Sequence, residues 1–253
     1  MADGDRLRLE ASLLLVENGV GRLLRIDAST GKTSQVVKSI PHAYAVAHTT
    51  STYLSAGNAL LRVDDGGAPV HVADAAEQIG PVATGQNGDV FYATGTRVFR
   101  LPGGAGSPIR IAGTGTQGYG GDGGPATAAL ISGPHGLAVA ADGAVLVSDT
   151  GNGRVRRIDP ATGIITTIAR LDAPRGLDVA ADGSIYVVDA TAGRVVHLAA
   201  GGRQLGSVGP VFADPYDVEA GDGGALYVID TSAHGRLYRI APDGTYRVVA
   251  RRT

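Results

Sequence analysis

One phrase of about forty residues recurs along this chain and constrains its fold more than any other feature. It runs as PHGLAVAADGAVLVSDTGNGRVRRID from Pro134, and altered copies begin at Pro174 and Pro215, after steps of 40 and 41 residues. An acidic residue and a following arginine recur in these copies as Asp149 and Arg154, Asp189 and Arg194, and Asp230 and Arg236. A fixed period of this length predicts stacked copies of one supersecondary unit.

Each copy is predicted to form four short strands separated by tight turns. In the clearest copy the expected strands cover residues 137–140, 144–148, 154–158 and 164–169. Asp142-Gly143 separates the first two, because Asp-Gly readily adopts the positive φ angles of a hairpin turn. β-Branched residues are frequent in the expected strands, while Gly, Pro, Asp and Asn gather in the turns, which is the usual division.

The same template covers the whole chain in six units, so we predict a single all-β domain over residues 1–253. The expected units are residues 2–40, 41–78, 79–130, 131–171, 172–212 and 213–253. Four-stranded antiparallel units around a common centre form a β-propeller, which avoids long exposed sheet edges by radial closure. An open stack would need polar capping units, and both end units here look like ordinary repeats. We therefore expect a six-bladed β-propeller.

The composition excludes several classes of protein. The net charge is −2 and no basic stripe occurs, which argues against nucleic acid as a partner. Without cysteine, the chain has neither a disulfide framework nor a thiolate metal site. No apolar run approaches the ~18 residues of a membrane span, and the start, MADGDRLRLE, lacks the apolar core of a signal peptide. We expect a monomeric domain without a membrane span, and the compartment stays open, the exported part of a larger protein included.

The repeated phrase also resembles a known family. PHGLAVAADGAVLVSDTGNGRVRRID is similar to an NHL repeat, the unit of six-bladed NHL propellers, and residues 113–139 resemble the bridge between such units. The resemblance covers the last three units most clearly, and the second unit departs most from it. It implies the propeller fold. It implies function only broadly, because such propellers host lyases, lactonase-like enzymes, kinase sensor domains and interaction modules.

The recurring acidic residue and arginine are expected to be structural, because a catalytic site needs unlike groups that converge. The repeated phrase begins with a proline at the start of the expected innermost strand, and we call the residue that follows this proline the entry residue. The entry residue is more informative, since it varies between units and is expected at the mouth of the central channel. Around the ring these positions carry Asp3, His42, Pro81 or Val82, His135, Arg175 and Tyr216, with Asp217 beside it. A few polar groups that converge on a pocket form the default candidate for a binding site. We therefore predict ligand contacts by His42, His135, Arg175, Tyr216 and Asp217.

A metal-dependent enzyme is the alternative interpretation. The Pro-His pairs at His42 and His135 are similar to the zinc-histidine entries of NHL-type peptidyl-hydroxyglycine amidating lyases, whereas the third entry carries Tyr216-Asp217. In this alternative His42 and His135 would hold a divalent metal, zinc or calcium. Arg175 would clamp a substrate carboxylate, and Tyr216 would be the acid–base group. Glu219 is a further carboxylate available for a lactonase-like site.

One long segment without expected strands, residues 114–129, contains the sequence GYGGDGGP. It lacks the strand, lysine and helix context of a phosphate-binding loop. A bridge between units can still overhang a channel mouth, so Tyr119 and Asp122 are added to the candidate ligand contacts.

Three functional hypotheses follow. The leading one is a binding or sensor module that presents the channel mouth to a small molecule or a protein, because a rigid propeller surface loses little freedom on binding. The second is the metal-dependent lyase or lactonase-like hydrolase. The third is a repeat module of a larger surface protein without an activity of its own.

Overall fold

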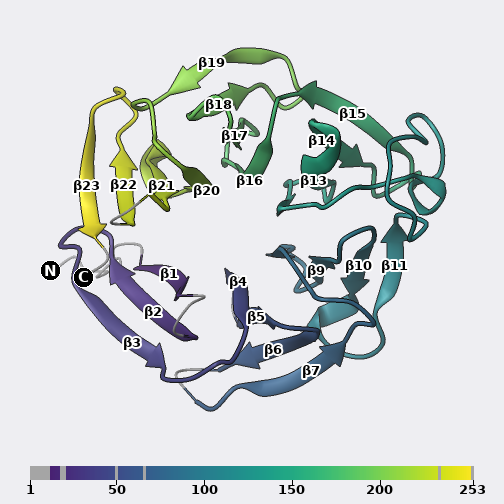
Figure 1. Cartoon of the computed structure of the whole chain (residues 1–253), viewed down its shortest axis with the longest axis horizontal. Coiled ribbons are helices and arrows are strands. Elements are labelled where there is room, and N and C mark those ends of the chain that lie inside the picture. Colours follow the sequence, from purple (N-terminus) through teal and green to yellow (C-terminus); the bar gives the residue numbers. More distant parts are fainter. Residues whose placement is uncertain (1–11, 18–20, 49–50, 65–66, 233–234, 252–253) are drawn as a thin grey trace, which may run out of the picture.

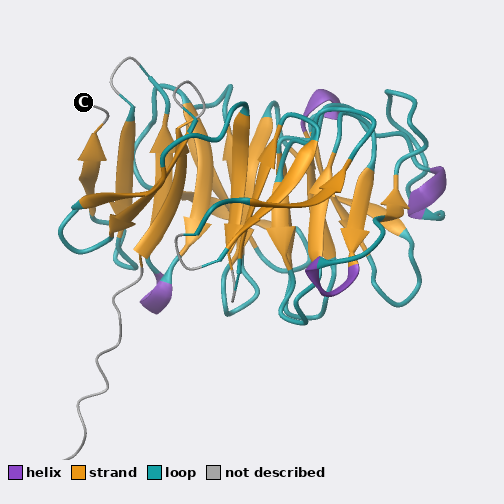
Figure 2. Cartoon of the chain, turned by 90° about the horizontal axis from the view of Figure 1, so that it is seen from below, coloured by secondary structure: helices purple, strands orange, loops and turns teal. Residues whose placement is uncertain are grey.

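The computed structural model describes residues 12–17, 21–48, 51–64, 67–232 and 235–251. Six antiparallel sheets stand around a central axis and close into a ring (Figure 1). This arrangement confirms the predicted six-bladed propeller. Viewed from the side, the strands span the height of the disc and the turns gather on its two faces (Figure 2).

Blades 2 to 6 each contain four strands that follow one another in sequence and in space. Blade 2 contains β4 (Ala43–His48), β5 (Thr52–Ala56), β6 (Ala59–Val63) and β7 (Val70–Asp74). Blade 3 contains β8 (Val82–Thr84), β9 (Val90–Ala93), β10 (Val98–Leu101) and β11 (Ile109–Ala112). Blade 4 contains β12 (Gly136–Val139), β13 (Val145–Asp149), β14 (Arg154–Ile158) and β15 (Ile165–Arg170).

The last two blades have the same order. Blade 5 contains β16 (Pro174–Val179), β17 (Ile185–Asp189), β18 (Arg194–Leu198) and β19 (Gln204–Val208). Blade 6 contains β20 (Pro215–Ala220), β21 (Leu226–Asp230), β22 (Arg236–Ile240) and β23 (Tyr246–Arg251). In the described part of the chain, four single-turn 3-10 helices lie in connections: η1 (Pro102–Gly104), η2 (Ala126–Ala128), η3 (Thr150–Asn152) and η4 (Asp222–Gly224).

Blade 1 has three strands among the described residues. These are β1 (Ser12–Glu17), β2 (Arg22–Asp27) and β3 (Thr33–Val37), and they pair in that order. The expected innermost strand of this blade, and with it the entry residue Asp3, lies outside the described residues.

The core lies between neighbouring blades, because each sheet buries side chains on both faces. All five residues of β13 are buried. From this strand Val145 and Val147 pack with Val98 and Ala112 of blade 3. Blades 1 and 6 close the ring in the same way, as Ile26 packs among Tyr227 and Leu237. Burial on both faces explains why the second strand of each unit reads as a nearly continuous apolar run.

Within the described part of the chain, none of the helical segments has the length and apolar character needed to cross a membrane.

Candidate functional site

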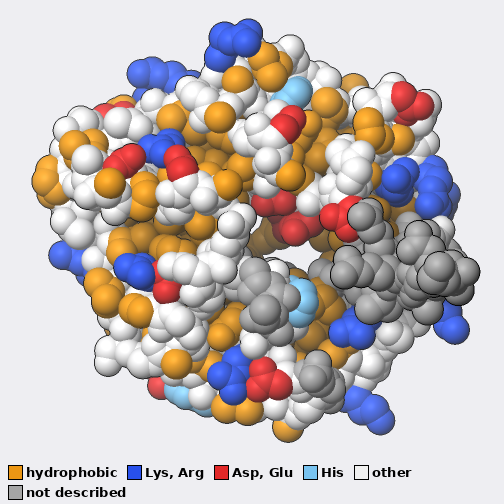
Figure 3. Space-filling model, turned by 180° about the vertical axis from the view of Figure 1, so that it is seen from behind, with side chains coloured by type: hydrophobic (Ala, Val, Ile, Leu, Met, Phe, Trp, Pro, Cys, Tyr) orange, Lys and Arg blue, Asp and Glu red, His pale blue; other side chains and the backbone are white. Residues whose placement is uncertain are grey.

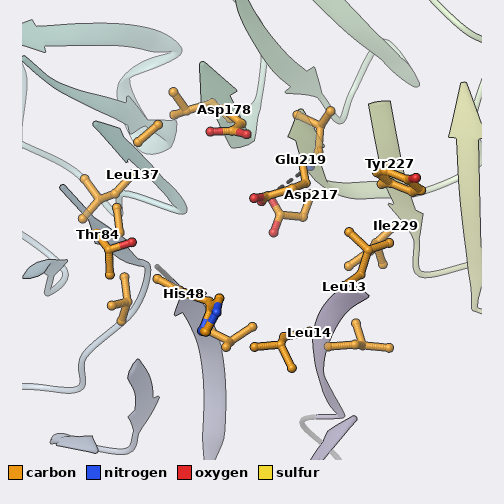
Figure 4. Close-up of a pocket in the computed structure, with 18 of the residues that line it drawn as sticks. Leu13, Leu14, His48, Thr84, Leu137, Asp178, Asp217, Glu219, Tyr227 and Ile229 are labelled. Atoms are coloured by element: carbon orange, nitrogen blue, oxygen red, sulfur yellow. Dashed lines mark hydrogen bonds between the residues drawn. The ribbon is translucent and has the colours of Figure 1, made fainter. Parts of the chain in front are cut away.

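The innermost strands β4, β8, β12, β16 and β20 surround a central cavity of ≈ 370 Å³ (Figure 4). A second cavity, of ≈ 750 Å³, adjoins it and shares Leu137, Leu177 and Asp217 as wall residues. Seen from one face, acidic side chains gather at the central opening (Figure 3). The channel is therefore polar in its middle and apolar along much of its wall.

Strand register places Tyr44, and not His42, at the entry position of blade 2. The first residue of each inner strand pairs with the last residue of the next strand, as Ala43 with Ala56, Pro174 with Asp189 and Pro215 with Asp230. Tyr44 is therefore the counterpart of Arg175 and Tyr216. His42 lies two residues earlier in an exposed turn with φ of 59°, a left-handed conformation that is uncommon outside glycine.

The entry of blade 3 is also shifted from the expected position. The amide of Gly80 donates to the carbonyl of Ala93, as the amide of His135 donates to Ser148 in blade 4. Gly80 is thus the counterpart of His135, in place of the expected Pro81 or Val82. Blade 3 accordingly contributes no entry side chain to the mouth.

Three blades are joined at the mouth by a chain of polar side chains. The Tyr216 hydroxyl donates to the Tyr44 hydroxyl across 2.6 Å. The Tyr44 hydroxyl lies 3.4 Å from Nδ1 of His135. The rings of His135 and Tyr216 also meet edge to face, with centroids 6.4 Å apart. Blades 2, 4 and 6 thus each contribute a side chain to one point at the mouth.

Arg175 adds a cation beside this cluster. Its Nη1 donates to Oδ1 of Asp214 across 2.9 Å and to the carbonyl of Pro215 across 3.4 Å. Its guanidinium carbon lies 5.7 Å from the centre of the Tyr216 ring, within the range of a cation–π contact. These contacts hold the guanidinium beside Tyr216, although Arg175 is only half-buried and lines neither cavity.

Burial and charge shift the protonation of this cluster. Desolvation by the protein around one side of the ring, followed by the positive charge of Arg175, lowers the pKa of His135, so its ring is neutral near pH 7. Burial, followed by the hydrogen bond to Tyr44, raises the pKa of Tyr216, so its hydroxyl keeps its proton. Both side chains are therefore present in their neutral forms.

An acidic belt lies deeper in the channel. Asp178 of β16 and Asp217 and Glu219 of β20 extend toward the cavity (Figure 4). Asp178 accepts the amide of Ala220 at 2.8 Å, and Asp217 accepts the amide of Val218 at 3.0 Å. All three remain reachable by solvent through the channel although protein surrounds them.

Desolvation by the surrounding protein raises the pKa of all three belt carboxyls, because the channel wall displaces much of the water that would solvate their charges. The pKa of Asp217 rises to about 7, with a further contribution from the negative charge of Asp178. Only Asp217 was among the predicted ligand contacts. Asp178 was not predicted from the sequence. A signal was present, because Asp178 and Glu219 occupy the position that Ala138 holds in blade 4, and a carboxylate replaces a small apolar residue there.

The described residues do not fit a three-ligand metal site. No group of three or more His, Asp and Glu side chains in this part of the chain is arranged to hold a metal ion. His42 lines neither cavity, and the Tyr44 hydroxyl occupies the Nδ1 side of His135. The metal-ligand role of His42 and His135 stays a prediction, and no step below goes through a metal.

The strap, residues 113–133, positions Tyr119 and Asp122 away from both cavities. Asp122 forms an ion pair of 2.8 Å with the buried Arg156 and accepts hydrogen bonds from Tyr119 and Thr167. The Tyr119 ring stacks 3.7 Å from the guanidinium carbon of Arg154. These contacts give both residues a structural role in holding the strap to blade 4, while their predicted ligand contacts stay untested.

Comparison with known proteins agrees with this architecture. Residues 132–158 match the model of the NHL repeat. No curated protein shows significant sequence similarity to the chain.

Several solved structures share the fold. Virginiamycin B lyase from Staphylococcus aureus is 15% identical, with a TM-score of 0.69, and the match covers 94% of this chain and 80% of the lyase. A gluconolactonase from Xanthomonas campestris is also 15% identical, with a TM-score of 0.70, covering 87% of this chain and 79% of that enzyme. A chain of a nidogen/laminin complex reaches a TM-score of 0.74 at 15% identity, covering 94% and 96%.

The chain is therefore a six-bladed β-propeller that contains an NHL repeat. At these identities the similarity establishes the fold alone, and both enzymes and binding propellers share it.

Proposed function

We propose that this propeller is a binding module whose ligand enters the central channel at the mouth formed by Tyr44, His135, Arg175 and Tyr216. The observation that carries the proposal is the hydrogen-bonded contact of Tyr216 with Tyr44 beside His135, which brings unlike polar groups from three blades to one point. Unlike groups that converge next to a cavity are the usual mark of a ligand site.

The energetics of the mouth support the same function. The side chains are held by contacts with other blades, so little side-chain freedom is left to lose when a ligand binds. Tyrosine and histidine each combine an apolar ring with a polar edge, which suits a site that must both desolvate and orient its ligand. Apolar wall residues such as Leu137 and Leu177 lie just behind these groups.

Tyrosine resonances offer a direct test. In protein labelled with ¹³C-tyrosine, Tyr44 and Tyr216 are assigned through Tyr44→Phe and Tyr216→Phe, and a fragment library of mixed charge is then screened. Ligands of the mouth are expected to shift these two signals. Tyr246 of the outermost strand is exposed and serves as an internal control. A library whose hits move only Tyr246, or none of these signals, contradicts the proposal.

A metal-dependent lyase or lactonase-like hydrolase is the second candidate. The acidic belt of Asp178, Asp217 and Glu219 is the feature nearest to it, because carboxylates in a channel are oxygen ligands for divalent cations, although the three side chains are not arranged as a ready-made metal site. A lyase and a gluconolactonase are among the proteins of similar fold. Metal analysis of the purified chain distinguishes this candidate from the binding module.

A further inference from the structure

We propose that the mouth selects its ligand through a carboxylate group, which Arg175 and His135 would bind as two hydrogen-bond donors. This inference rests on the proposed function and names the chemical class of its ligand. It follows from counting which atoms at the mouth carry protons and which of them have no partner in the described part of the chain.

The hydrogen-bond chain favours one tautomer of His135. A tyrosine hydroxyl has a single proton, and Tyr216 donates its proton to the Tyr44 oxygen. The Tyr44 hydroxyl is then free to donate its own proton to Nδ1 of His135, 3.4 Å away. A ring nitrogen that accepts a proton carries none, so the neutral ring holds its proton on Nε2. His135 is exposed, and its free edge is therefore a donor.

Arg175 presents only donors as well. A guanidinium has five N–H groups and no acceptor. Among the described residues, its only hydrogen-bond partners are Asp214 and the carbonyl of Pro215, and both bind Nη1. The Nε and Nη2 side of the fork has no partner there. The free N–H groups of Arg175 and His135 thus suit a ligand that offers hydrogen-bond acceptors.

The shape and charge of that acceptor follow from the same residues. A planar fork matches the two coplanar oxygens of a carboxylate, and a charge-assisted pair of this kind is about twice as strong as a neutral one. The acidic belt follows the mouth residues on the same strands: Asp217 comes directly after Tyr216, and Asp178 follows Arg175 by three residues, or about 10 Å at the usual rise of a strand. These carboxyls would repel a second anionic group. The ligand is therefore expected to carry its negative charge at the mouth end.

Benzoate, benzamide and inorganic phosphate are suitable probes, because benzamide keeps the shape of benzoate without its charge. We expect benzoate to shift the Tyr44 and Tyr216 signals, and benzamide to require at least about tenfold higher concentration. Arg175→Met should weaken benzoate by a similar factor. Arg62→Met is the matched control, because Arg62 pairs with Asp64 on the outside of blade 2, and it should leave benzoate binding unchanged.

Each outcome bears on one statement. Equal binding of benzamide and benzoate at the two tyrosines overturns the carboxylate but leaves the mouth as the binding site. Binding of phosphate without benzoate assigns the mouth to a tetrahedral anion and overturns it as well, as does the absence of any shift with benzoate.

A second measurement needs no ligand. The ¹⁵N signals of His135 should report a protonated Nε2 in the wild type, and Tyr44→Phe should mix the two tautomers. A proton on Nδ1 in the wild type overturns the donor argument, whereas the fragment screen would still test the mouth. Arg175→Lys keeps the charge without the planar fork, and its benzoate affinity should lie between those of wild type and Arg175→Met.

Discussion

The buried Arg156 provides the sharpest test of how this propeller is held together. Its side chain is fully buried, and it pairs with Asp149 at 3.1 Å and with Asp122 at 2.8 Å. Asp149 lies in the core of blade 4, whereas Asp122 belongs to the strap, so one guanidinium connects the two. Removing one member of a buried ion pair costs about 3–5 kcal/mol, because its partner keeps a buried charge.

We expect Arg156→Met to fall at the lower end of that range. Asp149 would still accept hydrogen bonds from the amide of Ser132 and the side chain of Asn152, each at 2.8 Å. A loss of about 3 kcal/mol lowers Tm by about 6–12 °C in a domain of this size. The assay is thermal and urea denaturation followed by circular dichroism, together with limited proteolysis of the strap, which should be cut faster in the variant.

The neighbouring residue is the matched control. Arg157 pairs with Asp142 at 2.6 Å and with Asp159 at 3.2 Å, but these groups are partly exposed. Such pairs contribute about 0–1 kcal/mol, so Arg157→Met should change Tm by less than about 4 °C. If Arg156→Met were no more harmful than Arg157→Met, the account of the strap as held by a buried ion pair would be wrong.

Three further predictions concern the channel. A Cβ on Gly176 would lie 2.6 Å from Cα of Asp217 on the next inner strand, so Gly176→Ala should lower the free energy of unfolding, measured in urea, by about 1–3 kcal/mol. Gly201→Ala is the control and should leave stability unchanged, because a Cβ there would meet no atom within 4 Å. Burial raises the pKa of Asp217 from 3.8 to about 7, so between these pH values the native state binds more protons than the unfolded chain. The contribution of Asp217 to the free energy of unfolding should therefore fall as the pH rises from about 4 to about 7. Asp217→Asn should remove that contribution, and an unchanged pH profile of unfolding would contradict the shift. In metal analysis, the binding module predicts the same content for wild type and His42→Ala/His135→Ala, whereas a stoichiometric metal lost from the double variant would favour the enzyme.

The architecture could be predicted from the sequence because the same structural signals occur in several copies of the repeat, so an atypical copy does not hide the pattern. Turn residues and apolar runs recur in several copies, so one degenerate unit does not alter the period. The expected strands of blade 4 agree with the observed ones to within one residue at every end. The innermost strand of blade 1 is the exception that remains open, because it lies outside the described residues.

The site was predicted less well, because a motif fixes chain spacing but not strand register. Pro41-His42 copies the Pro134-His135 pair in sequence, yet β4 begins at Ala43 and brings Tyr44 to the entry. A shift of two residues preserves the alternation of faces, so no apolar pattern reveals it. Only the pairing of Ala43 with Ala56 distinguishes the two alignments.

The repeat itself explains why function collects at so few positions. Most inner-strand residues either pack between blades or leave no room for a larger side chain, as at Gly136, where a Cβ would lie 2.5 Å from the carbonyl oxygen of Arg175. The entry residues and the acidic belt residues lie outside the apolar clusters that fill the space between blades, and their contacts with neighbouring blades are polar ones, as between Asp178 and the amide of Ala220. These positions are free to differ between blades without cost to the core. A ligand can therefore be recognised by Tyr44, His135, Arg175 and Tyr216 while the remainder of each unit keeps the common pattern, and variants at the entries should change binding far more than they change Tm.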